Sequence, residues 1–193
     1  MTIDAASHRA CPNDAEIRRL VQRLDRPVVL VGMMGVGKST VGKKLATLLH
    51  LEFCDADDAI EQAAQMSVSD IFDRFGEASF RDGERRVIAR LLAGGPSVIA
   101  TGGGAFAQEE TRKLILDGGI AVWLDAEVDT IVDRVRRKDN RPLLRGGDIR
   151  EIVTRLKAER APFYAAAPIH VPSGTGPHSD TVTRIVKELD GWR

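Results

Sequence analysis

Short apolar runs alternate with stretches of helical periodicity along most of this chain. From Pro27 onward, apolar residues recur at helical spacing in the regions between five runs that are typical of buried strands. These runs are Val28–Val31, Leu51–Cys54, Ser97–Ala100, Ile120–Leu124 and Ile169–Val171. Such alternation predicts an α/β fold with a five-stranded parallel sheet. Ligands bind such sheets at the carboxyl ends of the strands, so the residues after each strand are the first candidates for chemistry.

The segment before the first strand, residues 1–26, is predicted to be an extension. It mixes acidic and basic residues and lacks the apolar stretch of a secretory signal. Within it, the spacing of Ile17, Leu20, Val21 and Leu24 predicts a short amphipathic helix that packs on the domain or on a partner.

The residues after this extension, 27–193, suit one domain of ordinary size. The composition of the chain limits the kinds of partner that we expect it to bind. Lysine and arginine total 28, as do aspartate and glutamate, so we expect a small-molecule substrate and no nucleic acid or membrane partner. Cys11 and Cys54 are far apart in sequence, which favours free thiols and a reducing, cytoplasmic location. The longest uncharged apolar run, residues 28–37, is about half of a membrane span.

A glycine-rich loop follows the first predicted strand. Gly32 to Ser39, GMMGVGKS, fits G-x-x-x-x-G-K-[ST] at every position and precedes a helical pattern. Glycines let backbone N–H groups converge on phosphate oxygens at a helix N-terminus. Lys38 can reach the β- and γ-phosphates, and the Ser39 hydroxyl can ligate Mg²⁺. The loop predicts binding of a nucleoside triphosphate.

Two aspartates follow the second predicted strand. Asp55 and Asp57 are two residues apart, so they can share one face of the cleft. One carboxylate could hold a Mg²⁺ water and the other could accept a hydroxyl proton from an acceptor substrate. The structural alternative is helix capping, since Asp58-x-x-Glu61 resembles a capping box, but that explains Asp58 alone.

Two further stretches leave structural and functional interpretations open. A helix is predicted over Ala78 to Leu92, with Arg81, Glu84 and Arg85 on one face, where a surface ion pair between Arg81 and Glu84 is the simpler account. Gly102, Gly103 and Gly104 end the third strand, and either a ligand or a tight turn could require them.

The charged segment after the fourth strand is a candidate lid. It contains several arginines and the run Pro142–Gly147, so it could bring arginines onto the phosphates; a solvated basic loop is the alternative. The next helix is predicted from Asp148 to about Ala161 and ends at Pro162. Arg160 continues its apolar stripe, and an inward-facing arginine requires an anionic partner.

Taken together, these motifs resemble the shikimate kinase family. The resemblance spans Pro27 to Trp192, and the motifs appear in the family's order. They are GMMGVGKST (Gly32 to Thr40), DAD (Asp55 to Asp57), FRDGE (Phe80 to Glu84), GGGA (Gly102 to Ala105), RPLL (Arg141 to Leu144) and RAPFY (Arg160 to Tyr164). Many nucleotide enzymes share the first motif, but the combination is specific, and no motif position is substituted.

The resemblance implies a fold and an activity. The fold would be that of P-loop nucleoside monophosphate kinases, with strand order 2-3-1-4-5, a shikimate-binding region at about 55–92 and a mobile lid at about 137–147. The enzyme would use ATP and Mg²⁺ to phosphorylate the 3-hydroxyl of shikimate, giving 3-phosphoshikimate and ADP in chorismate and aromatic amino acid biosynthesis. Small members of the family imply a monomer.

The resemblance also implies roles on the nucleotide side. Lys38 and the surrounding loop residues would hold the phosphates. These loop residues are Gly35, Val36, Gly37, Ser39 and Thr40. Ser39 and, through water, Asp55 would hold Mg²⁺. Arg134 would flank adenine, and Arg141 would stabilise charge on the transferring phosphoryl group. The segment Ser173 to Ser179 would also contact adenine, but its pattern selects no single residue.

On the acceptor side, Asp57 would bind the shikimate hydroxyls and act as the base. Arg81 and Arg160 would pair with the carboxylate, and Glu84 would support the arginines. Gly103 and Gly104 would offer backbone contacts to the ring.

Two alternatives stay open at this point. A gluconate kinase would share the loop and fold, although the D-x-D motif, the glycines and the two arginines favour shikimate. A nucleotide-binding regulator without catalysis would be a different class, and intact Lys38, Asp57 and Arg141 argue against it.

Overall fold

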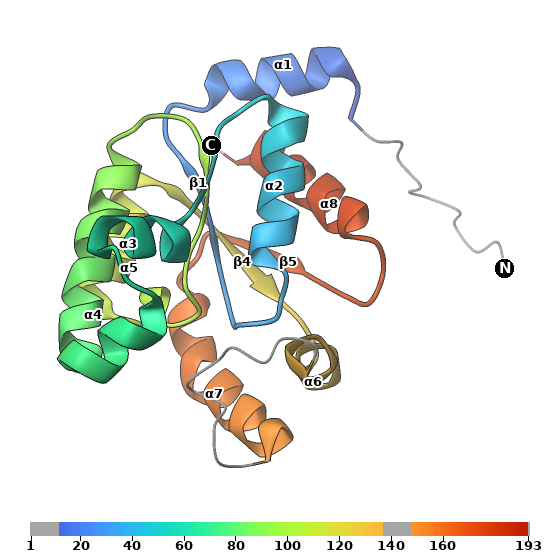
Figure 1. The fold of residues 1–193 in the computed structure, drawn as a ribbon. Coiled ribbons are helices and arrows are strands. Elements are labelled where there is room, and N and C mark those ends of the chain that lie inside the picture. The colour runs from blue at the N-terminus through green and yellow to red at the C-terminus, as the bar shows by residue number, and fades with distance from the viewer. Residues whose placement is uncertain (1–11, 137–147, 193) are drawn as a thin grey trace, which may run out of the picture.

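The computed structural model describes residues 12–136 and 148–192. Five strands form one parallel sheet in the order β2-β3-β1-β4-β5 (Figure 1), as the sequence and the family resemblance predicted. The strands are β1 (Val28–Val31), β2 (Phe53–Asp55), β3 (Val98–Ala100), β4 (Ile120–Asp125) and β5 (Ile169–Pro172). β1 is central and fully buried, so the phosphate loop that follows it emerges in the middle of the sheet edge.

Helices connect the strands. In chain order they are α1 (Asp14–Arg23), α2 (Lys38–Leu49), α3 (Ala56–Ala64), α4 (Val68–Leu92), the short 3₁₀ helix η1 (Ala105–Ala107), α5 (Glu109–Gly118), α6 (Val128–Arg136), α7 (Ile149–Tyr164) and α8 (His178–Gly191). None of the helices in the described ranges is long and apolar enough to cross a membrane.

The predicted N-terminal helix is present as α1. Asn13 caps it, accepting from the backbone N–H groups of Ala15 and Glu16 at 3.0 Å. Ile17 and Leu20 are buried and belong to the same core as the sheet. α1 packs on α2, and Arg23 pairs with Asp190 of α8 at 2.5 Å. Packing of this helix on the fold, one of the two predicted possibilities, is therefore observed.

Three predicted boundaries are wrong. β2 begins at Phe53 instead of Leu51, because the backbone N–H of Leu51 still bonds the Ala46 carbonyl, at 2.9 Å, after the turn that ends α2. α4 begins at Val68, ten residues before the predicted start at Ala78, and it contains a kink at Gly76, where φ is 76°. α7 continues through Pro162 to Tyr164, because a proline in the last turn removes only one helical hydrogen bond.

A second, smaller apolar cluster lies between α3 and α4. Its buried members are Ile60, Ile71, Phe80 and Val87. This cluster holds the two helices together beside the main core, so the side chains that α3 and α4 point toward the sheet edge are fixed relative to one another.

Candidate active site

The phosphate loop lies between β1 and α2. Gly32, Gly35 and Gly37 have positive φ values of 132°, 79° and 101°, which L side chains rarely adopt. A β-carbon at Gly32 would also collide with the carbonyl oxygen of Leu124. The ammonium group of Lys38 is buried and donates to the carbonyls of Gly32 and Met33, at 2.8 and 2.9 Å. The loop is thus wrapped around its own lysine at the N-terminus of α2.

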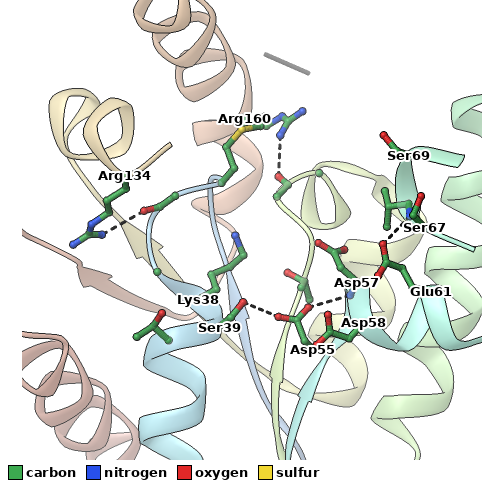
Figure 2. Close-up of a pocket in the computed structure, with 18 of the residues that line it drawn as sticks. Lys38, Ser39, Asp55, Asp57, Asp58, Glu61, Ser67, Ser69, Arg134 and Arg160 are labelled. Atoms are coloured by element: carbon green, nitrogen blue, oxygen red, sulfur yellow. Dashed lines mark hydrogen bonds between the residues drawn. The ribbon is translucent and has the colours of Figure 1, made fainter. Parts of the chain in front are cut away.

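Ser39 and Asp55 meet beside this loop. The Ser39 hydroxyl donates to Asp55 Oδ2 at 2.6 Å (Figure 2), and the other oxygen of Asp55 accepts from the backbone N–H of Asp57 at 3.1 Å. Among the described residues, no group of three or more His, Cys, Asp or Glu side chains could hold a metal ion. A hydroxyl and a carboxylate at the loop nevertheless suit Mg²⁺, which takes oxygen ligands and keeps several waters and substrate phosphates.

Helix capping, the structural alternative for these aspartates, is wrong for Asp58 but is observed at Asp55, whose side chain accepts from the backbone N–H of Asp57. Asp55 is the N-cap of α3, and Asp57 and Asp58 belong to its first turn. Glu61, the other half of the proposed capping box, accepts from the backbone N–H of Val68 at 2.8 Å instead. Asp55 and Asp57 do line one cavity, but a strand-to-helix turn brings them together, because Asp57 is already helical.

Arg160 faces Asp57 across the cavity. Its Nη1 donates to the Gly103 carbonyl at 3.0 Å, so the arginine that continues the apolar stripe of α7 has a backbone partner here (Figure 2). Gly103 and Gly104 also line the cavity.

Each glycine of the triple-glycine turn is in close contact with a neighbour. A β-carbon at Gly102 would lie 2.8 Å from Asp57 Oδ1 and 2.9 Å from Glu84 Oε1, and one at Gly104 would lie 2.6 Å from Arg81 Nη2. The glycines therefore allow side chains from α3 and α4 to lie directly against the turn.

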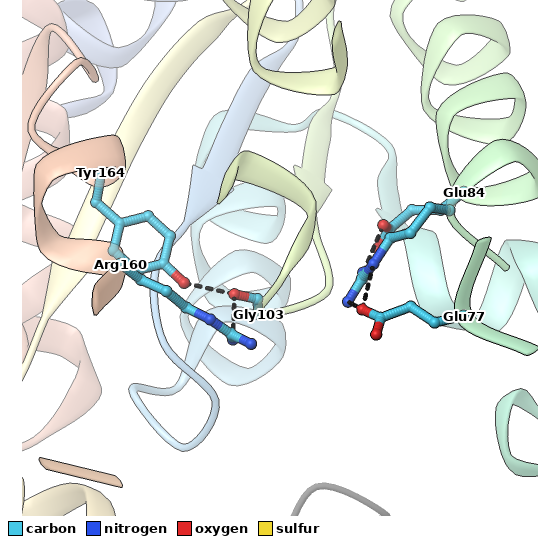
Figure 3. Close-up of polar contacts among 6 residues, drawn as sticks. Glu77, Glu84, Gly103, Arg160 and Tyr164 are labelled. Carbon is cyan, nitrogen blue, oxygen red and sulfur yellow. Dashed lines mark hydrogen bonds and ion pairs between the residues drawn. The ribbon is translucent and has the colours of Figure 1, made fainter. Parts of the chain in front are cut away.

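Arg81 is held by two glutamates of its own helix. Its Nη1 donates to Glu84 at 2.8 Å and its Nη2 to Glu77 at 3.0 Å (Figure 3). Arg81 is not among the residues that line the cavity. Arg85, expected near this pair, instead contacts Asp82 at 2.6 Å and Glu110 at 3.1 Å.

The Arg81–Glu84 pair is not the surface ion pair of the simpler account. The Glu84 side chain is 1% exposed and that of Arg81 15%. Burial raises the pKa of Glu84, and the opposing charge of Arg81 does not cancel this effect. Burial acts to lower the pKa of Arg81, but the neighbouring charges of Glu84 and Glu77 leave it raised.

Arg134 of α6 lies on the opposite side of the phosphate loop. Its guanidinium donates to the carbonyls of Val36 at 3.0 Å and Gly174 at 2.6 Å. His178 also lines the cavity there, and a β-carbon at Gly37 would lie 3.2 Å from its ring. Burial lowers the pKa of Arg134; burial, together with the positive charges of Arg134 and Lys44, lowers that of His178.

One cavity of about 710 Å³ joins these groups. Its lining includes most of the predicted site residues, namely Gly35, Gly37, Lys38, Ser39, Thr40, Asp55, Asp57, Gly103, Gly104, Arg134 and Arg160. Val36 is buried and does not line the cavity. Arg141 and the predicted lid, residues 137–147, lie outside the described residues.

Sequence reasoning missed several residues at this site. His178, Glu61, Ser67 and Ser69 line the cavity, Glu77 pairs with Arg81, and Tyr164 bonds Gly103. His178 falls in the segment from which the sequence selected no residue. Tyr164 ends the RAPFY motif, but the motif suggested no role for it, and Glu61 was considered only as half of a capping box. Ser67, Ser69 and Glu77 belong to no recognised motif.

Known proteins match this chain over nearly its whole length. The family model described as shikimate kinase matches residues 34–190. A shikimate kinase of Novosphingobium aromaticivorans is 60% identical, with 93% of this chain and 95% of that protein covered. The structure of a shikimate kinase from Acinetobacter baumannii in complex with shikimate is 34% identical and superposes with a TM-score of 0.84, covering 89% of this chain and 96% of that one.

The gluconate kinase alternative is supported only in fold. A gluconokinase structure from Sinorhizobium meliloti has a TM-score of 0.56 at 17% identity, covering 86% of this chain and 93% of that one.

The match to the family model and the 60% identity to a shikimate kinase show that this chain belongs to the shikimate kinase family, a family of ATP-dependent kinases.

Proposed function

We propose that the cavity of Figure 2 is where this chain transfers the γ-phosphoryl group of ATP to the 3-hydroxyl of shikimate. The observation that carries the proposal is that one cavity is lined both by the phosphate loop and by Asp57 and Arg160. A phosphate donor and an anionic, hydroxylated acceptor can therefore occupy it together. Phosphoryl transfer depends chiefly on such positioning and on electrostatic stabilisation.

On the nucleotide side, the loop amides and Lys38 would hold the phosphates. The lysine now bonds two loop carbonyls, at 2.8 and 2.9 Å, and it would exchange these for β- and γ-phosphate oxygens when ATP binds. Arg134 and His178 line the cavity beside Gly37 of the loop, and the adenine would bind against them. Arg141, in the lid, keeps the role that the family resemblance implies.

The Mg²⁺ site would use the Ser39 hydroxyl directly and Asp55 through water. Their 2.6 Å contact places two hard oxygen donors at the loop, which fits this ion. When bound, the metal would neutralise charge on the β- and γ-phosphate oxygens.

On the acceptor side, Arg160 would pair with the shikimate carboxylate. Its Nη1 donates to the Gly103 carbonyl and the guanidinium also hydrogen-bonds the Tyr164 side chain, but a guanidinium carries five donors, so others can reach a carboxylate. Arg81 would join it by exchanging Glu77 for the substrate, while the buried Glu84 continues to hold the guanidinium. Asp57, from the first turn of α3, would accept hydrogen bonds from the hydroxyls.

The reaction follows from this arrangement. The 3-hydroxyl oxygen of shikimate attacks the γ-phosphorus, and its proton passes to the carboxylate of Asp57. A new bond forms between that oxygen and phosphorus, the bond from the γ-phosphorus to the bridging oxygen breaks, and ADP leaves. Lys38 stabilises the charge that moves toward the leaving oxygen.

We also propose that the enzyme acts as a monomer in the cytoplasm, without nucleic acid or membrane partners. The equal totals of 28 basic and 28 acidic residues support the absence of nucleic acid and membrane partners, because the chain carries no net charge to attract polyanions. The family resemblance supports the monomer, and the two cysteines, far apart in sequence, support the reducing compartment.

The test is ADP release with ATP and Mg²⁺, measured with shikimate, with gluconate and with neither acid, followed by identification of the phosphorylated position by NMR. We expect release that depends on shikimate and a phosphate on the 3-hydroxyl. ATP binding without shikimate-dependent release would contradict the proposal, and release with gluconate would favour the alternative.

A further inference from the structure

Tyr164 is a buried polar residue that the proposed mechanism does not use. It is the only tyrosine in the sequence and its side chain is 1% exposed. It follows Arg160 by four residues on α7, so the two side chains point to the same side of the helix. Its hydroxyl donates to the Gly103 carbonyl, which also accepts from Arg160 at 3.0 Å (Figure 3).

The phenol is held in place and stays protonated. Its ring stacks with those of Phe106 and Trp123, with centroid separations of 6.4 and 5.9 Å. Burial raises the pKa of Tyr164 to about 12, although the positive charges of Arg160 and Arg81 oppose the shift. At neutral pH the hydroxyl is therefore a fixed hydrogen-bond donor.

The carbonyl that it holds lies at a crowded point of the site. A carbonyl oxygen has two lone pairs, and here Tyr164 and Arg160 occupy both. On the other side of Gly103, a β-carbon would lie only 3.0 Å from the backbone nitrogen of Met34 in the phosphate loop. Any shift of Gly103 would therefore change both its hydrogen bond with Arg160 and its distance from the phosphate loop.

We propose that Tyr164 is a positioning residue for the acceptor pocket. Its hydroxyl fixes the Gly103 carbonyl and, through that carbonyl, the guanidinium of Arg160 and the Gly102–Gly104 turn against which Arg81 lies. The inference rests on the proposed function of this cavity. A purely structural hydroxyl would affect stability and both substrates alike.

Steady-state kinetics of Tyr164→Phe test the proposal. This change keeps the stacked ring and removes only the donor. We expect the KM for shikimate to rise about threefold to tenfold, as for the loss of one hydrogen bond, with the KM for ATP within about twofold of wild type. An equal rise in both KM values, or an unchanged KM for shikimate, would overturn the proposal.

Ser173→Ala is the matched control on the nucleotide side. The Ser173 hydroxyl is fully buried and donates to the Val36 carbonyl of the phosphate loop at 2.7 Å. Removing it should raise the KM for ATP more than that for shikimate. The same pattern in both variants would mean that any lost buried hydroxyl loosens the whole site, which would also overturn the proposal.

Since Tyr164 is the only tyrosine, incorporation of 3-fluorotyrosine labels this site alone in the full-length chain. This measurement does not depend on whether the phenylalanine variant folds. We expect its single ¹⁹F resonance to shift when shikimate is added, and a resonance unmoved at saturating shikimate would overturn the proposal. Wild-type protein that neither binds nor phosphorylates shikimate would instead overturn the proposed function, and this inference with it.

Discussion

Glu84 receives a hydrogen bond from Arg81 at 2.8 Å through one carboxylate oxygen, while its other oxygen, Oε1, has no hydrogen-bond partner among the described residues. The carboxylate lies against Gly102, with the charge of Asp57 nearby. Desolvation outweighs the pairing with Arg81, and the pKa of Glu84 is raised. Holding Arg81 with a buried, charged Glu84 therefore lowers the stability of the folded state.

The pH dependence of stability should reveal this cost. Because the folded-state pKa of Glu84 lies above the ordinary value of 4.5, the folded state binds this proton more tightly than the unfolded state does. Protonation of Glu84 contributes favourably to the free energy of unfolding below about pH 4.5, and this contribution is lost as pH rises through the raised pKa. We predict that the free energy of unfolding of wild type, relative to that of Glu84→Gln, falls across this window. Denaturant titrations at several pH values would show it, and a difference that rises with pH would contradict the assignment.

Glu77 occupies donors of Arg81 that the proposed contact with the shikimate carboxylate would require. It contacts Nε and Nη2 of the guanidinium at 3.2 and 3.0 Å, and its own side chain is 60% exposed. An exposed pair of this kind is worth about 0–1 kcal/mol. We predict that Glu77→Gln tightens shikimate binding by up to about fivefold, measured by calorimetry. Glu110→Gln, which removes an exposed partner of Arg85, is the control and should change nothing. Weaker binding in Glu77→Gln would mean that Glu77 orients Arg81.

Arg160→Lys should separate the two substrates. Lysine retains the charge but cannot make a planar two-point contact with a carboxylate. Loss of one charge-assisted hydrogen bond predicts shikimate binding weaker by about tenfold to a hundredfold, with ATP binding nearly unchanged. The matched control is Arg155→Lys on the exposed face of the same helix, where the arginine lies 3.8 Å from Glu159. Equal losses of both ligands would rule out this role for Arg160.

Gly104→Ala should damage the acceptor pocket specifically. The added carbon would lie 2.6 Å from Nη2 of Arg81, so the guanidinium must leave its position between Glu77 and Glu84. We predict a large rise in the KM for shikimate with a smaller effect on ATP. Gly83→Ala, on α4 with nothing within 4 Å of the new carbon, should keep activity and add about 0.5–1 kcal/mol of stability. An unchanged KM for shikimate in Gly104→Ala would show that shikimate binding does not require the Arg81 guanidinium at its present position.

Local patterns predicted much of this molecule. The period of apolar residues gave the five strands, and the parallel order confirmed the fold. The phosphate loop was readable because its glycines need positive φ values, a property of each residue alone. The association of Asp55 with Ser39 was also accessible, since Asp55 ends β2 and Ser39 follows the loop after β1, both at the carboxyl edge of the sheet.

What the sequence could not give depends on long-range contacts. Glu84 looked like half of a surface pair, because its burial comes from packing against the Gly102–Gly104 turn, about twenty residues away in sequence. The choice between a ligand and a tight turn at the glycines missed a third reason, which is the close approach of Asp57, Glu84 and Arg81. The predicted helix ended before Tyr164, so the sequence did not predict that Tyr164 lies one helical turn after Arg160.

The most direct test of the account is a pair of measurements on Asp57→Asn, namely shikimate binding by calorimetry and phosphoryl transfer in a single turnover with ATP and Mg²⁺. Asparagine keeps the size of the side chain and can still hydrogen-bond a hydroxyl, but it cannot take the proton. The account predicts binding within about tenfold of wild type and transfer slower by about a hundredfold or more. Transfer at nearly the wild-type rate would contradict the assignment of Asp57 as the base.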